Sequence, residues 1–294
     1  RRQRQMCIRD SLICAVVAIV AVLSITVYMF AKGTPALAKV GVTDLLFGTA
    51  WQPTAANPTY GIFYIICTSI IGTAVAIAIG VPIGILTAVF ITEVSNKKIA
   101  AIVQPAVELL AAIPSVIYGL LGMMLLNPLM YKLEKHIFAG STTHQFTGGA
   151  NLLSAIIVLA IMILPTVINI SVSSIRAVPG HMKAASLALG ATHIQTIFKV
   201  MIPAAKSGIL AAVILGVGRA LGETMAVMMV VGNQPRVPNS ILQGVRTLTT
   251  NIVMEMGYAT DLHREALIAT GVVLFAFILI INLCFSAIKR SGKE

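Results

Sequence analysis

Two charged residues, Arg219 and Glu223, lie inside an apolar stretch that is long enough to cross a lipid bilayer. The stretch extends from Ile209 to Val231. An arginine at the centre of a membrane helix costs roughly 2.5–3.5 kcal/mol even on a permissive insertion scale, so such a residue is usually retained for a function. Because four positions separate the two residues, we expect them to share one helical face and to form an ion pair.

The guanidinium group of Arg219 predicts that this stretch handles an anion. Its planar set of N–H donors matches the oxygens of phosphate and of other oxyanions. We therefore predict that Arg219 belongs to a translocation pathway or gate, together with Glu223, its partner when no anion is present, and the adjacent Thr224. The alternative, that the pair only fixes the register of two packed helices, stays open from these residues alone.

Three more polar residues in apolar stretches are candidates for lining the same path: Glu108, Ser115 and Thr166. Ser115 and Thr166 each follow a proline. Proline removes one backbone hydrogen bond and a hydroxyl can satisfy the freed carbonyl, so these segments either line a path or simply bend a helix. With Glu108 ionised, the spans would hold two acids against one base. Either Glu108 faces a surface or a partner subunit, or one carboxyl is protonated, or the pair works as a gate and not as a binding site.

The composition is that of a protein that crosses the membrane several times. Of 294 residues, 57% are hydrophobic and 11% are charged, with a mean hydropathy of +0.94. A soluble domain has about 25% charged residues. The apolar stretches leave no room for a soluble domain, so any energy-consuming domain is expected on another chain.

The net charge of +11 reflects membrane orientation rather than nucleic-acid binding. The basic residues are scattered between apolar stretches and are more numerous in the segments on the side of the two termini, which is therefore expected to be cytoplasmic. The four cysteines and five histidines show no metal-ligand spacing, and we expect neither a metal site nor a disulfide framework. The histidines all lie in predicted loops, and no nucleophile–base pair lies within a span, which argues against an enzyme.

Six apolar stretches predict an all-α protein with six transmembrane helices in a single domain, residues 1–294. The stretches are 12–30, 60–91, 99–130, 152–175, 209–231 and 266–288. We divide the chain into a first helix and outer loop (1–59), a core (60–288) that contains the inner loop 177–205, and a cytoplasmic tail (289–294). The first stretch is too long for the 7–15 apolar residues of a signal peptide, although Ala36-Leu37-Ala38 resembles a cleavage site.

Three local features modify this arrangement. Gly80-Val81-Pro82-Ile83-Gly84 predicts a kink in the second span. The third stretch exceeds the roughly 20 residues of one crossing, so we expect it to be broken or to lie partly along the surface. Trp51 and Tyr60 are expected at the membrane interface, where aromatic rings anchor.

The inner loop predicts two short helices joined at a glycine. The first covers His181 to Leu189, and Gly190 fits the position after its end. Thr192 and Gln195 have the spacing of a capping box that starts the second helix, and Pro203 ends or kinks it. Such a loop is either a rigid socket for a partner or a basic amphipathic segment on the membrane surface.

Two motifs resemble those of ATP-driven (ABC) importers. Ala184-Ala185-Ser186-x-x-x-Gly190, followed by Val200-Met201-Ile202-Pro203, resembles the EAA loop of importer permeases, with Ala184 where that family usually has Glu. The segment from Gly218 to Val227 is similar to the membrane subunits of the phosphate-specific importer, and its Met-Ala-Val ending is similar to the PstC type. The resemblance covers essentially the whole chain.

The resemblance implies a permease of the type I importer kind in the bacterial cytoplasmic membrane, carrying inorganic phosphate. Its coupling helix would dock into the ATPase, and ATP and Mg²⁺ would bind to that subunit, with no cofactor on this chain. The implied partners are a PstA-like second permease, a PstB-like ATPase dimer and a PstS-like phosphate-binding protein, besides membrane lipid and without nucleic acid. A permease for another oxyanion and a stand-alone secondary anion transporter are the alternatives; the latter requires inverted repeats.

Overall fold

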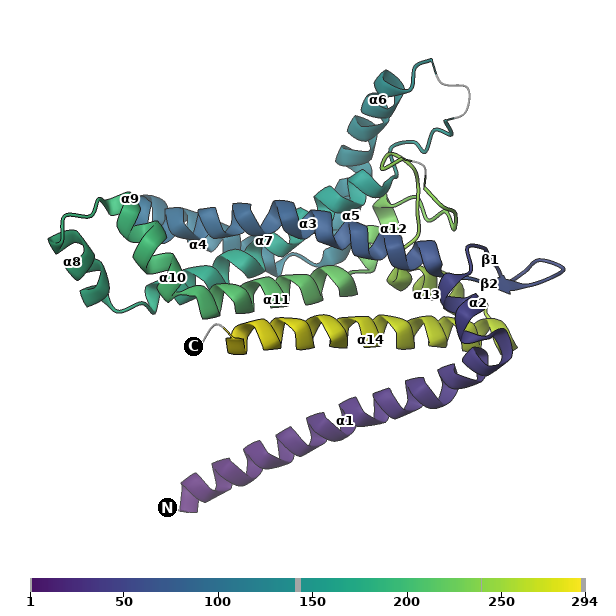
Figure 1. Cartoon of the computed structure of the whole chain (residues 1–294), viewed down its shortest axis with the longest axis horizontal. Coiled ribbons are helices and arrows are strands. Elements are labelled where there is room, and N and C mark those ends of the chain that lie inside the picture. Colours follow the sequence, from purple (N-terminus) through teal and green to yellow (C-terminus); the bar gives the residue numbers. More distant parts are fainter. Residues whose placement is uncertain (1, 141–143, 239, 292–294) are drawn as a thin grey trace. The chain divides into compact units, whose positions relative to one another are not determined.

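The computed structural model describes residues 2–140, 144–238 and 240–291, and it is almost entirely helical (Figure 1). Five helices are long and apolar enough to cross a membrane, and a bent pair of helices makes a sixth span if it is counted as one. The prediction of an all-α membrane protein is confirmed. The described chain forms two compact units.

The first unit comprises the chain up to Phe63 together with Asn251–Ala276. It contains α1 (Arg2–Val40), α2 (Val42–Phe47), the two-stranded hairpin β1 (Trp51–Gln52) and β2 (Thr59–Tyr60), most of α13 (Leu248–Met256) and the first half of α14 (Asp261–Ser291). Gly33 of α1 packs against α14, where an added Cβ would lie 3.2 Å from the Cα atom of Ala269.

Trp51 and Tyr60 pair across this hairpin and are buried, so the expectation that they anchor in the lipid interface is wrong. The indole Nε1 of Trp51 donates to Oε2 of Glu255 at 2.9 Å, and Nε2 of His263 lies 2.8 Å from the same oxygen. Desolvation by burial raises the pKa of Tyr60. The polar ends of these rings are satisfied by protein groups, and they need no headgroup region.

The second unit contains Tyr64–Thr250 and the chain from Phe277 onwards. Its helices, in order, are α3 (Phe63–Val89), η1 (Phe90–Val94), α4 (Lys97–Ala112), α5 (Ser115–Leu121), η2 (Gly122–Leu126), α6 (Asn127–Ile137), α7 (Leu152–Arg176), α8 (Gly180–Ala188), α9 (His193–Thr196), η3 (Ile197–Met201), α10 (Ile202–Ala204), α11 (Lys206–Gly222) and α12 (Met225–Val230). The π-helical segments η1, η2 and η3 continue neighbouring α-helices.

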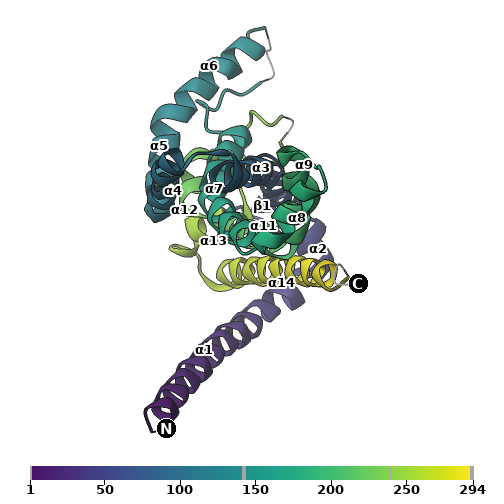
Figure 2. The same cartoon turned by 90° about the vertical axis from the view of Figure 1, so that its left-hand side faces the viewer.

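Helix α7 is the centre of this unit. It is the span with the largest buried share, and it packs against α4, α11 and α12 (Figure 2). Helix α3 approaches α7 through two glycines, because a Cβ at Gly80 would lie 2.7 Å from Ile163 and one at Gly84 would lie 2.8 Å from Val167. The glycines that predicted a kink therefore serve close packing, and α3 continues through Pro82 without a break.

Two apolar stretches are interrupted. The third is broken at Ile113 and Pro114, between α4 and α5, which confirms the expected break. The fifth was expected to be one helix, but α11 ends at Gly222 and a separate helix, α12, begins at Met225. At the other end of α11 the chain bends by 70° between the segments His193–Ala204 and Lys206–Gly222.

Candidate translocation site

Arg219 lies in the last turn of α11, half-buried within the span. Its Nη1 donates to the hydroxyl of Thr166 on α7 at 3.4 Å, a long hydrogen bond. The structure thus brings together two of the predicted pathway residues from helices that the sequence could not place side by side. Thr166 is neutral and takes only one of the N–H donors of Arg219. The remaining donors, and the positive charge, stay available to an anion.

The expected ion pair between Arg219 and Glu223 is wrong for the described chain. Glu223 is the residue at which α11 ends, with an extended backbone at φ −68° and ψ 129°, so the two side chains do not share a helical face. Its Oε1 instead accepts the backbone N–H of Ala226 at 3.2 Å, in the first turn of α12. A carboxylate at the start of a helix also meets the positive end of the helix dipole.

Thr224 occupies the interruption between the two helices. Its hydroxyl donates to the carbonyl oxygen of Gly222 at 3.2 Å, and its own carbonyl accepts the N–H of Met228 at 2.8 Å. The carbonyl oxygens of residues 222–224 thus accept hydrogen bonds from Thr224, Thr249 and Met228 in a segment that is not helical. Such non-helical backbone within a span is tolerated only inside protein or beside a water-filled space.

A small hydroxyl-lined cavity of about 20 Å³ adjoins Glu223. That volume accommodates about one water molecule. Thr68, Ser69 and Thr73 of α3 line one side, and Thr247 and Thr249 line another. The hydroxyl of Thr68 donates to the carbonyl of Arg246 at 2.8 Å, and the hydroxyl of Ser69 accepts the N–H of Leu248 at 2.9 Å, so these two groups hold the segment 246–249 to α3.

Glu108 lies apart from Arg219, in a cleft of about 430 Å³ between α4 and the end of α7. Its carboxylate accepts the side-chain N–H of Gln104 at 3.2 Å, and Gln104 in turn accepts Nη2 of Arg176 at 2.9 Å. Lys97 lines the same cleft. Glu108 thus lies beside two bases, Lys97 and Arg176, and not beside Arg219. The excess of acidic over basic residues that was counted for the spans therefore does not describe the surroundings of Arg219.

The two proline segments behave differently. Pro114 separates α4 from α5 and Ser115 is the first residue of α5, whereas α7 runs through Pro165 without interruption. The hydroxyl of Tyr118 bridges the first break by donating to the carbonyl of Leu110 at 2.7 Å. The expected role of the hydroxyls in satisfying freed carbonyls is not observed at Ser115 or Thr166 in the described chain.

The inner loop has the predicted construction. Helix α8 ends in a Schellman motif, in which Gly190 has φ +84°, its N–H bonds the carbonyl of Leu187 at 3.0 Å, and the N–H of Ala191 bonds that of Ser186 at 3.2 Å. The Thr192–Gln195 capping box is present with both hydrogen bonds. Pro203 lies in the last helical turn before the bend at Ala205.

Helix α8, which carries Ala184 and Ala185, has no buried residue, so a whole helix projects from the unit. It is held at two points. The hydroxyls of Ser186 and Thr196 lie 2.9 Å apart, and Nζ of Lys183 lies 2.5 Å from Oε2 of Glu93 in η1. Glu93 lies just after the predicted second span, 60–91. Its place beneath α8 depends on a contact across 90 residues, and no local pattern indicates such a contact.

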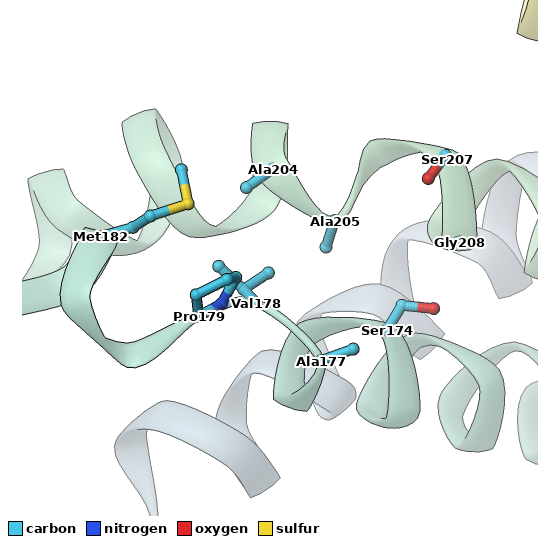
Figure 3. Close-up of a pocket in the computed structure, with 9 residues that line it drawn as sticks. All are labelled: Ser174, Ala177, Val178, Pro179, Met182, Ala204, Ala205, Ser207 and Gly208. Atoms are coloured by element: carbon cyan, nitrogen blue, oxygen red, sulfur yellow. The ribbon is translucent and has the colours of Figure 1, made fainter.

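A hollow of about 510 Å³ lies between the end of α7, the start of α8 and the bend before α11 (Figure 3). Most of the side chains around it are small. Next to it α11 comes very close to α7, since an added Cβ at Gly208 would lie 2.1 Å from Oγ of Ser174. The bend is therefore flanked by tight packing on one side and open space on the other.

Comparison with known proteins gives a consistent result. The family described as "Binding-protein-dependent transport system inner membrane component" matches residues 80–291. A probable ABC transporter permease protein, YqgH of Bacillus subtilis, is 39% identical over 92% of this chain and 86% of its own length. The phosphate transport system permease protein PstC of Xylella fastidiosa is 34% identical, over 94% and 88% respectively.

Solved structures show the same fold at low sequence identity. A bacterial ABC transporter involved in the import of alginate aligns with a TM-score of 0.66 and 18% identity over 99% of both chains. The MetNI methionine ABC transporter, in an inward-facing conformation, aligns with a TM-score of 0.54 and 20% identity over 79% of this chain and 94% of the other.

Proposed function

Because the chain belongs to the family of binding-protein-dependent transport system inner membrane components, we propose that it is the permease subunit of an ATP-driven importer that carries inorganic phosphate. The observation that carries this proposal is the half-buried guanidinium of Arg219, which bonds a neutral hydroxyl rather than a carboxylate. The PstC relatives support phosphate as the anion.

In this proposal Arg219 supplies transient donors to a partly dehydrated anion. Its planar fork matches two phosphate oxygens, and its neutral neighbour Thr166 does not compete for the charge. Glu223 stabilises the break between α11 and α12, and its hydrogen bond with the N–H of Ala226 holds its carboxylate away from Arg219. Thr224 adds a hydroxyl at the same break, and Ser115 and Glu108 stay predicted lining residues further away.

The relatives named as phosphate transport system permease proteins support a set of separate partner subunits. We propose a PstA-like second permease, a PstB-like ATPase dimer that binds ATP and Mg²⁺, and a PstS-like phosphate-binding protein, with no cofactor on this chain. The projecting α8, with Ala184, Ala185 and Gly190, is the proposed contact to the ATPase. Both termini and α8 are then cytoplasmic, in the inner membrane of a bacterium.

The test is ATP-dependent uptake of radiolabelled phosphate in vesicles that contain all four kinds of subunit. Arg219→Gln removes a charged donor worth about 1.5–3 kcal/mol, so uptake should fall by roughly ten- to a hundredfold while the complex still assembles. Arg219→Lys should keep part of the activity. Lys206→Gln, at the exposed start of the same helix, is the matched control and should transport normally.

Two outcomes would contradict the proposal. Undiminished phosphate uptake by Arg219→Gln would remove the role of Arg219. Uptake of sulfate or a phosphonate in place of phosphate by the unmodified complex would show that phosphate is not the transported anion.

A stand-alone transporter would work without an ATPase, whereas we expect an ATPase to co-purify with the chain and to be lost when residues 181–203 are deleted.

A further inference from the structure

Four polar residues follow one face of α7 from the level of Arg219 to the end of the helix: Thr166, Asn169, Ser173 and Arg176. Their spacing of three, four and three residues keeps them within one side of an α-helix. All four are at least partly exposed, whereas Val167, Val172 and Ile175, which lie on other faces of the helix, are buried.

Each end of this polar face meets a cation. At one end Arg219 donates to Thr166, and at the other Arg176 opens into the cleft that it shares with Lys97. Arg176 is exposed and donates to the neutral Gln104, and Glu108 lines the same cleft. An anion that moved along this face would therefore start and finish beside a guanidinium group that hydrogen-bonds a neutral side chain, and at the second end Arg176 and Lys97 outnumber the carboxylate of Glu108.

The middle of the face has donors that are not committed to the fold. The side-chain amide of Asn169 forms no hydrogen bond with any residue that the structure describes. Ser173 donates its hydroxyl to the main-chain carbonyl of Asn169 at 2.9 Å, so its oxygen can still accept. Water or an oxyanion would find the Asn169 N–H donors available without breaking any bond in this chain.

A polar face of this kind is costly against lipid. Helix α7 is an apolar span, and an uncovered amide in hydrocarbon loses its hydrogen bonds to water. The face must therefore meet either water or a permanently packed neighbouring subunit. The cations at both ends favour water, because a packed interface has no need of two unpaired guanidinium groups.

We propose that this face of α7 lines the part of the anion path between Arg219 and the cleft at Arg176, and that Asn169 is a specificity-determining residue on it. The inference rests on the proposed function and deepens it, because it gives the route that the anion takes after Arg219. Asn169 replaces part of the hydration shell of the anion midway, and Arg176 receives it before release.

Cysteine accessibility tests the route in the assembled importer. In a parent chain in which Cys7, Cys14, Cys67 and Cys284 are replaced by serine, single cysteines are introduced as Asn169→Cys or Ser173→Cys. The matched control is Ser171→Cys, which lies between them on the same helix but is fully buried. The probe is a membrane-impermeant anionic methanethiosulfonate, applied from the side of α8.

Cysteines at 169 and 173 should react at least roughly tenfold faster than the control, and phosphate, but not sulfate, should slow the reaction severalfold. Reaction should also block uptake. Rates at 169 and 173 as low as at 171 in both nucleotide-free and vanadate-trapped complexes would overturn the inference, as would fast reaction that phosphate leaves unchanged. If the unmodified complex transports no phosphate, the proposed function fails instead, so the two failures are distinguishable.

A charge variant gives a second measurement. Asn169→Asp adds a negative charge at constant size and should lower phosphate uptake at least roughly tenfold through repulsion. Asn169→Gln keeps the amide and should retain most activity. Equal uptake by Asn169→Asp and the unmodified protein would contradict the role of Asn169.

Discussion

The hydroxyl of Thr249 donates to the main-chain carbonyl of Glu223 at 3.0 Å, and so the segment 246–249 holds the point at which α11 ends. Twenty-six residues separate the two in the sequence. This bond from a distant segment stabilises the interruption of the fifth span. Substitutions in that segment should therefore alter transport, although its residues do not contact the anion.

Thr249→Val removes this hydrogen bond at nearly constant volume. We expect the complex to lose about 0.5–1.5 kcal/mol of stability, or somewhat more if the carbonyl stays buried without a partner. Thr249→Ser keeps the hydroxyl and is the control. Thermal unfolding in detergent measures the stability, and phosphate uptake measures the effect on the break. Identical behaviour of the two variants would indicate that the bond has no such role.

Substitutions of Glu223 separate its capping role from its charge. Glu223→Gln keeps an oxygen that can accept the N–H of Ala226, whereas Glu223→Ala removes it, at a cost of about 0.5–2 kcal/mol for a lost cap. We therefore expect Gln to retain more uptake than Ala, measured at equal amounts of assembled complex. Equal loss in both variants would instead favour a requirement for the negative charge, as in the ion pair expected from the sequence.

Gly119 lets α5 and α12 approach each other closely. An added Cβ would lie 2.8 Å from the Cα atom of Ala226, which belongs to backbone and cannot move aside easily. Gly119→Ala should destabilise the protein by about 1–3 kcal/mol, as overpacking does. Gly218→Ala, where nothing lies within 4 Å, is the control and should be neutral or slightly stabilising. The midpoint of thermal unfolding reports both.

The ion pair between Lys183 and Glu93 should link the projecting loop to the rest of its unit. Removing either charge singly, by Lys183→Gln or Glu93→Gln, should reduce the uptake obtained per ATP hydrolysed. The exchange Glu93→Lys with Lys183→Glu should restore part of it, since the attraction is kept with its sign reversed. The ratio of phosphate uptake to ATP hydrolysis is the measurement, and additive losses in the exchange variant would argue against a direct link.

The features that the sequence predicted best are those decided by neighbouring residues. The end of α8 at Gly190 and the capping box at Thr192 depend on residues within one helical turn, and both are present as expected. Hydropathy likewise located the spans. The break after Gly222 escaped prediction because the apolar run continues through it.

What the sequence could not provide are contacts between distant segments. The partner of Arg219 is Thr166, which lies 53 residues away, and nothing near Arg219 indicates which helix packs beside it. The position of Glu108 in a separate cleft and the burial of Trp51 by Glu255 are of the same kind. Proline followed by a hydroxyl residue could not distinguish the broken segment at Ser115 from the continuous one at Thr166.

The 70° bend at Ala205 also has a mechanical meaning. A force along the axis of His193–Ala204 has a component along α11 of only about a third of its magnitude, because that component scales with the cosine of the bend angle. The component perpendicular to α11 is larger, and it would tilt the helix about its first residue, Lys206. If a partner pushes on α8 and α9 as proposed, α11 would tilt about Lys206, and its far end at Arg219 would be displaced more sideways than along the helix axis.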